Sequence, residues 1–206
     1  MRHTTSHRSI VLLAIGLLCA GASIAGERFE NATAGISLER PAGWSTLSMQ
    51  QVEENRRRVR LSDKEMEEAI RNSAGAPLFA FTRHPEPHSD QNPSIQVMLR
   101  PLGSMAGSSP KAILKSIAEP LRQTFQDFQF DKEIHETEIS GLKAAHTRVR
   151  FTVRNDAGEE FKTLSRLWIV PRGAHLFIIG MSGPQGGPEV SEMEFGQVLA
   201  SIRIDP

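Results

Sequence analysis

Residues 131–181 read DKEIHETEISGLKAAHTRVRFTVRNDAGEEFKTLSRLWIVPRGAHLFIIGM, and this stretch decides the fold. It contains four strand-like runs that short turns separate, each turn containing a glycine. The predicted strands cover residues 131–139, 142–154, 159–170 and 175–181. Because turns this short join antiparallel neighbours, the stretch predicts a meander of antiparallel strands.

The residues on both sides of the meander predict further strands and helices. Strands are predicted at 27–32, 35–39, 78–82 and 94–100. Helices are predicted at 48–60, 62–75, 110–125 and 189–201. Helices that each present one apolar stripe need a sheet to cover. The order of elements therefore predicts an α+β fold in which helices cover a large antiparallel sheet.

The helix at 110–125 has the strongest sequence pattern. Ser109 is suited to the N-cap, and Pro110 occupies the first helical position. Pro120 lies inside the pattern and is expected to kink or shorten the helix, because proline lacks the backbone N–H group. Outside the helices, Trp44 is expected to pack in the core, since a large aromatic side chain gains most from burial.

The first residues have the layout of a signal peptide. Arg2 and Arg8 make the start basic, residues 10–20 are mostly apolar, and small residues lead to Ala25. The apolar stretch is shorter than the roughly 20 residues that span a bilayer. The pattern predicts cleavage after Ala25, a signal peptide at 1–25 and a single domain at 26–206. A periplasmic or secreted protein with no remaining membrane span is expected.

Composition limits what the exported domain can do. Cys19 is the only cysteine and lies inside the predicted signal, where Leu18 does not suit lipoprotein processing. After cleavage the domain would have no cysteine, so disulfides and thiol chemistry are excluded. The chain has 24 basic and 24 acidic side chains, and no field of positive charge favours nucleic acid as a partner.

Two segments carry a resemblance to a known family. The first, residues 34–44, reads AGISLERPAGW, and the second, residues 195–204, contains VLASI at the end of the last predicted helix. Together with the order of elements, they resemble the Mog1/PsbP-like superfamily, including its bacterial exported DcrB-type branch. The resemblance implies an α/β/α sandwich around an antiparallel sheet. It also implies a binding or assembly role without a shared catalytic motif and without a cofactor.

A row of cationic residues on two predicted strands is the first candidate site. A tight turn at Ser140-Gly141 sets Ile139 opposite Leu142. The same-face pairs that follow are His135 with His146, Glu133 with Arg148, and Asp131 with Arg150. The pairs fit either an ordinary charged sheet face or a polar groove for an anionic ligand or partner. In the second interpretation the binding residues are His146, Arg148, Arg150 and Arg154.

A proline-rich loop is the second candidate site. His84, His88 and Asp90 lie within seven residues, and imidazole with carboxylate suits zinc or manganese. The alternative is a solvated loop between strands, since a metal site needs three or four convergent ligands.

The arginine-rich segment 56–60 is the third candidate, as a contact to anionic lipid. Acidic residues surround it, which also fits a solvated helix face. Three functions follow from these patterns. The leading hypothesis is an exported, non-enzymatic binding or assembly module that acts through an envelope protein partner. The alternatives are a metal-binding or hydrolytic protein centred on His84, His88 and Asp90, and a peripheral envelope protein held by segment 56–60.

Overall fold

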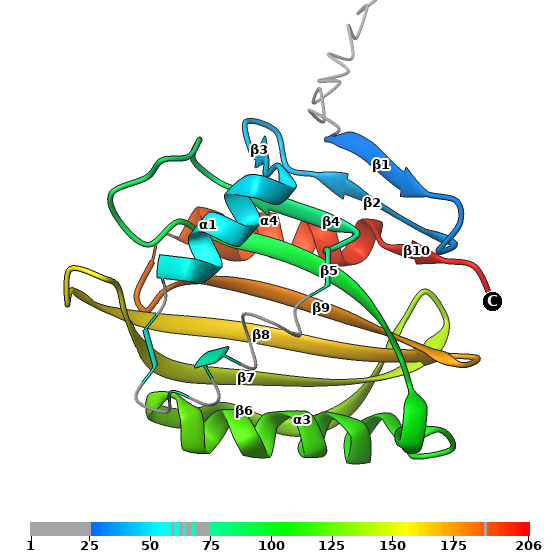
Figure 1. The fold of residues 1–206 in the computed structure, drawn as a ribbon. Coiled ribbons are helices and arrows are strands. Elements are labelled where there is room, and N and C mark those ends of the chain that lie inside the picture. The colour runs from blue at the N-terminus through cyan, green and yellow to red at the C-terminus, as the bar shows by residue number, and fades with distance from the viewer. Residues whose placement is uncertain (1–25, 59, 62–63, 65–66, 69–74, 188) are drawn as a thin grey trace, which may run out of the picture.

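The predicted meander forms four strands of a seven-stranded antiparallel sheet (Figure 1). The computed structural model describes residues 26–58, 60–61, 64, 67–68, 75–187 and 189–206. The predicted signal peptide at 1–25 lies outside the described residues, as does most of the helix predicted at 62–75.

The strand order in the large sheet is β3-β4-β5-β9-β8-β7-β6. The strands are β3 (Ser45–Thr46), β4 (Phe79–Thr82), β5 (Ser94–Pro101), β6 (Gln126–Ile139), β7 (Leu142–Arg154), β8 (Glu160–Arg172) and β9 (His175–Pro184). Each neighbouring pair is antiparallel, so the predicted meander is confirmed. The pairing of β5 with β9 joins the earlier strands to the meander.

A second, three-stranded sheet lies beside the first. It consists of β1 (Glu27–Asn31), β2 (Ile36–Arg40) and β10 (Arg203–Ile204), with β2 in the middle. The predicted strands at 27–32 and 35–39 are confirmed, but their separation into a sheet of their own was not predicted. The reason is that β10, which completes this sheet, is only two residues long and has no readable alternation.

Helices cover both faces of the large sheet. They are α1 (Met49–Arg58), α3 (Pro110–Thr124), α4 (Glu189–Ser201) and the 3₁₀ turn η1 (Gly103–Met105). Figure 1 shows α1 and α3 on one face, with α4 on the other. The α+β prediction of helices on a large antiparallel sheet is therefore confirmed. Among the described residues, no helix combines the length and apolar character that crossing a membrane requires.

Alternation along the strands divides the core between the two faces. On β9, Phe177 and Ile179 point toward α4 and the small sheet, where Phe195 is also buried. Leu176 precedes Phe177, points to the opposite face of the sheet, and packs on the α3 side with Leu114. A further cluster, Leu47, Val52 and Ala80, seats α1 on β4. Trp44 is 3% exposed and lies in the α4-side core, as predicted.

Helix α3 begins as its sequence predicts. The side chain of Ser109 accepts a hydrogen bond from the N–H of Ala112 at 3.2 Å, and Pro110 follows it. Pro120 does not shorten the helix, which continues to Thr124. The hydroxyl of Thr124 donates to the carbonyl of Pro120 at 2.9 Å and supports the last turn.

The turn between β1 and β2 anchors the C-terminal end of the chain. The carbonyl of Gly35 accepts hydrogen bonds from the N–H of Asp205 at 2.9 Å and from Nη1 of Arg172 at 3.4 Å. Nη2 of Arg172 also donates to the carbonyl of Ala34 at 2.8 Å. Gly35 has a φ of 60°, and a Cβ there would lie 2.7 Å from Nη1 of Arg172. Both the backbone conformation and the close arginine therefore favour glycine.

Gly35→Ala is expected to lower the free energy of unfolding by about 1.5 kcal/mol, because it strains the backbone and displaces Arg172. Gly141→Ala is the matched control, since Gly141 has a φ of 76° and nothing within 4 Å of its added Cβ. The control should lose only about 1 kcal/mol through backbone strain. Urea unfolding of both variants measures the difference, and equal losses would show that Arg172 does not constrain Gly35.

Candidate functional site

The cationic residues predicted on one strand do lie on one side of β7. Ile139 pairs with Leu142 and His135 pairs with His146, as the tight turn predicts. His146 is opposite Trp168 of β8, and Trp168 belongs to the α4-side core. The even-numbered residues of β7 therefore lie on the same face of the sheet as α4. From His146 onward, these even-numbered residues are polar.

Bulges in β6 change the pairs beyond His135. Lys132, not Glu133, lies opposite Arg148, so the predicted pair of Glu133 with Arg148 is wrong. Between Lys132 and His135 the strand contains one residue more than β7 does, and further irregularities follow toward Gln126. A bulge reverses the alternation of the strand that carries it, which a prediction of uniform pairing cannot include.

The bulged segment places one carboxylate between two arginines. Oδ2 of Asp131 contacts Nε of Arg148, and Oδ1 of Asp131 lies 2.7 Å from Nη2 of Arg150. The predicted contact of Asp131 with Arg150 is thus present as an ion pair. The Asp131 side chain is 17% exposed, whereas those of Arg148 and Arg150 are 38% and 46% exposed. Asp131 therefore fixes two guanidinium groups that solvent still reaches.

Two histidines and a tryptophan adjoin this ion-paired group. Nδ1 of His135 lies 3.0 Å from the carbonyl of Glu133, and a carbonyl can only accept, so this nitrogen carries the proton. Nε2 of His135 then accepts from Nδ1 of His146 at 3.4 Å. The His146 ring stacks on Trp168 with centroids 4.3 Å apart. Its buried Nε2 has no hydrogen-bond partner among the described residues.

The environment keeps the His146 ring neutral at pH 7. Its pKa falls from 6.5 to about 4, first because burial disfavours the charged ring. Electrostatic interaction with His135 and with the cations Lys132, Arg148 and Arg166 lowers the pKa of His146 further. A proton on His146 would therefore enter a partly desolvated site that is already cationic.

Arg166 extends the site toward α4. Arg166 is 6% exposed, and its guanidinium ion-pairs with Glu192 and lies 5.2 Å from the centroid of the Phe195 ring. Burial lowers the pKa of Arg166, and Glu192 acts in the opposite direction. Arg166 and Trp168 were not predicted as site residues, although both lie on β8 at positions that share the face of His146. We define the polar face as Asp131, His135, His146, Arg148, Arg150 and Arg166.

Arg154 has a different environment from the rest of the predicted row. It lies at the end of β7, and Nη2 is 2.5 Å from Oε1 of Glu160. It also lines a cavity beside α1. The polar face therefore includes three of the four predicted residues, and Arg154 belongs to another part of the surface.

The predicted metal loop brings two of its three residues together. The rings of His84 and His88 stack with centroids 4.6 Å apart, and one oxygen of Asp90 accepts from the N–H of Gln91. Within the described ranges, no group of three or more His, Cys, Asp or Glu side chains is placed to hold a metal ion. Metal binding by this loop stays a prediction.

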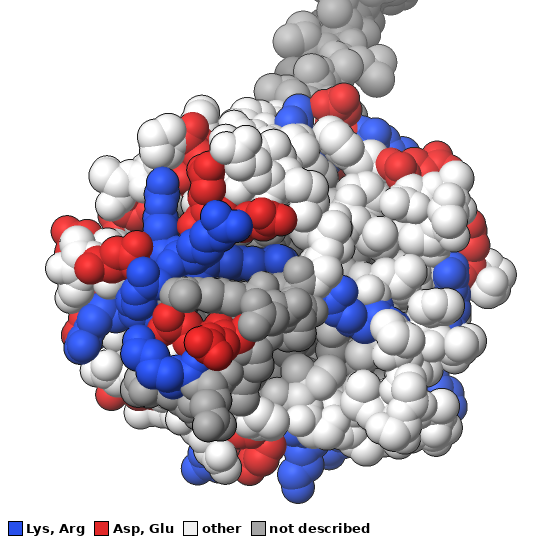
Figure 2. Space-filling view, in the orientation of Figure 1, with Lys and Arg blue, Asp and Glu red and all other residues white. Residues whose placement is uncertain are grey.

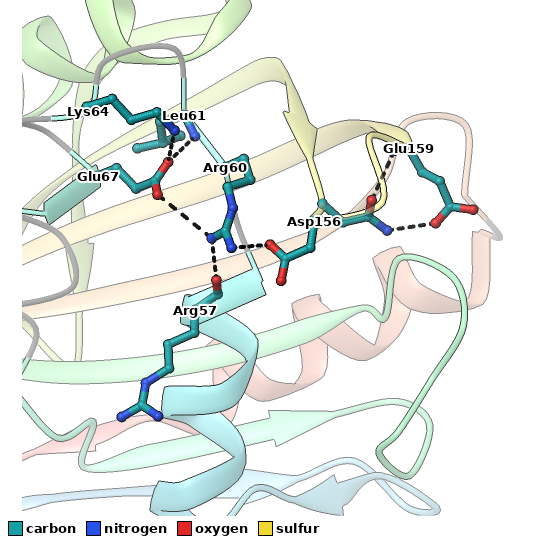
Figure 3. Close-up of polar contacts among 8 residues, drawn as sticks. Arg57, Arg60, Leu61, Lys64, Glu67, Asp156 and Glu159 are labelled. Atoms are coloured by element: carbon teal, nitrogen blue, oxygen red, sulfur yellow. Dashed lines mark hydrogen bonds and ion pairs between the residues drawn. The ribbon is translucent and has the colours of Figure 1, made fainter.

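Acidic side chains interleave with the arginine-rich segment 56–60. Figure 2 shows Lys and Arg gathered near the end of α1 with Asp and Glu among them. In Figure 3, Arg60 lies between Glu67 and Asp156, at 3.8 and 2.6 Å, and donates to the carbonyl of Arg57. Arg57 is 3.6 Å from Glu53. Much of this charge is neutralised locally, which favours a solvated helix face.

What the polar face can do follows from its groups. It offers a neutral imidazole on an indole, two fixed and half-exposed guanidinium groups, and a buried arginine. Preformed hydrogen-bond donors of this kind suit recognition of carboxylates or phosphates.

Comparison with known proteins concerns the fold. No protein-family model matches the chain, and no curated protein matches it. The solution structure of cyanobacterial PsbP (CyanoP) from Synechocystis sp. PCC 6803 matches with a TM-score of 0.52 and 13% identity, over 91% of this chain and 97% of that chain. The crystal structure of LpqN, involved in cell envelope biogenesis of Mycobacterium tuberculosis, matches with a TM-score of 0.50 and 12% identity, over 88% and 86%.

A third match is to a longer chain. A crystal structure from Bacteroides thetaiotaomicron VPI-5482 is 17% identical with a TM-score of 0.48, over 88% of this chain, and this chain spans only 49% of it. At such identities the likeness concerns the fold alone. The narrower resemblance to the DcrB-type branch stays a prediction. The match to CyanoP over nearly the whole of both chains shows that this chain has the Mog1/PsbP-like fold.

Proposed function

We propose that the chain is exported to the cell envelope and acts there as a non-enzymatic binding or assembly module, through a protein partner. The signal-like start at 1–25 supports export. The fold supports an envelope role, since LpqN, which is involved in cell envelope biogenesis, shares it. The polar face carries the proposal, because its binding groups are held in place before any partner arrives.

The charge of the polar face selects an acidic partner segment. The two arginines that Asp131 fixes remain 38% and 46% exposed. Lys132 and Arg166 add positive charge, while Asp131 and Glu192 are the acids that contact the arginines. The basic side chains of this region therefore outnumber these two acidic ones. Because Asp131 already holds the two arginines in place, they would lose less conformational entropy when a partner binds. Aspartate or glutamate side chains of a partner would pair with Arg148 and Arg150.

Reversing two charges on the polar face is expected to weaken capture of the partner at least about tenfold. The variant is Arg148→Glu with Arg150→Glu, and the measurement is the amount of crosslinked partner recovered from cells that express the full precursor. The matched control is Lys111→Glu with Lys115→Glu, two exposed positions of α3 on the other side of the sheet.

Two results would contradict the proposal. An equal loss of the crosslinked species in the α3 variant would indicate a general effect of net charge. Recovery of an intact Met1 terminus on a cytosolic protein would contradict export, and N-terminal sequencing of the same preparation provides that result.

A further inference from the structure

Residues from three separate candidate sites line one cavity of about 290 Å³. Arg58 comes from the end of α1, and His88 and Asp90 come from the loop between β4 and β5. Arg154 comes from the end of β7, beside the turn that leads to β8. From the sequence, these residues were predicted to belong to a lipid contact, a metal loop and a cationic row. The fold instead brings them to a single concave site.

This cavity lies on the other face of the sheet from the polar face. Val153 of β7 and Phe161 of β8 line it, and their parity is opposite to that of His146 and Trp168. Gln96 of β5 lines it as well, whereas its neighbour Val97 packs in the α4-side core. The cavity therefore opens on the α1 side of the sheet. A ligand bound there would not contact the polar face.

Hydrogen bonds within the loop hold the wall of the cavity in place. Nδ2 of Asn92 donates to the carbonyl of His84 at 2.8 Å and to Oε1 of Glu86 at 3.0 Å. Nε2 of Gln91 donates to the hydroxyl of Thr163 at 2.7 Å, which ties the loop to β8. Because the wall is attached to two strands of the sheet, the cavity is preformed.

Two opposite charges in the cavity lining remain available to a ligand. Arg154 is paired with Glu160, and both oxygens of Glu86 already accept hydrogen bonds. Arg58 makes no ion pair with another described residue. Within the part of the chain that the structure describes, Asp90 accepts through Oδ1 alone, from the N–H of Gln91. The cavity lining thus contains a cation from α1 and a carboxylate from the loop between β4 and β5.

Neutral polar groups share the lining with these charges. The amide side chains of Asn55 and Gln96 line the cavity and have no hydrogen-bond partner among the described residues. Primary amides carry donors and an acceptor, so they match the N–H and C=O groups of a peptide bond. Phe161 and Val153 add apolar surface.

We infer that this cavity binds a short zwitterionic peptide. The carboxylate of the peptide would pair with Arg58, its ammonium with Asp90, and its peptide groups with the amides of Asn55 and Gln96. The volume of about 290 Å³ suits a ligand of a few residues. A neutral polyol would use the amides and leave both charges unpaired.

Titration with triglycine tests this inference, with backbone amide shifts of the whole protein followed by NMR. Shifts are expected at residues that line the cavity and not on the polar face. Arg58→Gln and Asp90→Asn are each expected to weaken binding about tenfold, the effect of losing one charge-assisted hydrogen bond. Arg57→Gln is the matched control, because Arg57 is the neighbouring arginine and does not line the cavity.

Further probes separate the ligand classes. N-acetyl-triglycine amide has the same peptide groups without charges and should bind at least about tenfold more weakly than triglycine. Ser89→Trp places an indole at the cavity from an exposed loop position, so it should abolish the shifts without disturbing the core. Equal shifts with D-glucose, or no shifts at lining residues with triglycine, would overturn the inference. Loss of partner capture by the polar-face variant would leave it unaffected.

Discussion

Phe177→Ala is expected to lower the free energy of unfolding by about 3–5 kcal/mol. Phe177 is 0% exposed and lies on β9, which pairs with β5 on one side and β8 on the other. The guanidinium of Arg172 lies 5.1 Å from the centroid of its ring. Truncation would leave a cavity where the two halves of the large sheet meet, and the surrounding strands cannot collapse into it. Urea unfolding followed by circular dichroism measures the loss.

Met193→Ala provides the control for this prediction. Met193 is 59% exposed on α4, so its truncation should change stability by less than about 0.5 kcal/mol. If Phe177→Ala does not fold, Phe177→Leu keeps most of the volume and should still be less stable than the unmodified protein. Equal unfolding midpoints for the Phe177 and Met193 variants would contradict the position of Phe177 in the core.

Lowering the pH from 6.5 to 4 is expected to destabilise the protein partly through His146. Its pKa is about 4 in the folded protein and 6.5 when the ring is free, so the unfolded chain binds the proton first. The contribution of His146 to stability is complete above pH 6.5 and is lost as the pH falls toward 4. The full linkage is about 3 kcal/mol. Because the ring is only half buried, we expect a loss of about 2 kcal/mol.

His146→Gln isolates this effect from the titration of carboxylates. The variant should lose less stability than the unmodified protein over the same pH range, when unfolding is measured in urea at a series of pH values. His175→Gln is the control, because His175 is an exposed histidine at the start of β9. A decline in His146→Gln as steep as that of the unmodified protein would show that the ring does not cause it.

Local patterns predict much of the fold. The last helix was predicted at 189–201, and α4 spans Glu189–Ser201. The strands at 142–154 and 94–100 were predicted to within one residue, because glycine- and proline-containing turns bound them. The small sheet was not predicted, since β2 and β10 are far apart in the chain and are brought together by packing on the same core. Such long-range pairing leaves no periodic signal.

The sequence predicted the contacts of the candidate site correctly only for the regular cross-strand pairs next to the turn between β6 and β7. The turn at Ser140-Gly141 set His135 opposite His146, and the structure confirms that pair. Beyond it, the bulges of β6 decide the contacts, so Asp131 meets both arginines and Glu133 does not meet Arg148. The role of Arg166 also depends on α4, which supplies Glu192 from a segment 26 residues away. Neither a bulge nor a helix contact follows from alternation alone.

The bulges of β6 have a consequence beyond the polar face. Strand β6 terminates the large sheet, and its 14 residues could offer a foreign strand a long row of backbone groups. Three irregularities interrupt the spacing of those groups between Gln126 and His135. A foreign strand with regular spacing matches such a row poorly, so these irregularities disfavour edge-to-edge pairing along this part of β6. The same extra residues that bring Asp131 to its arginines therefore also make this edge a poorer template for another strand.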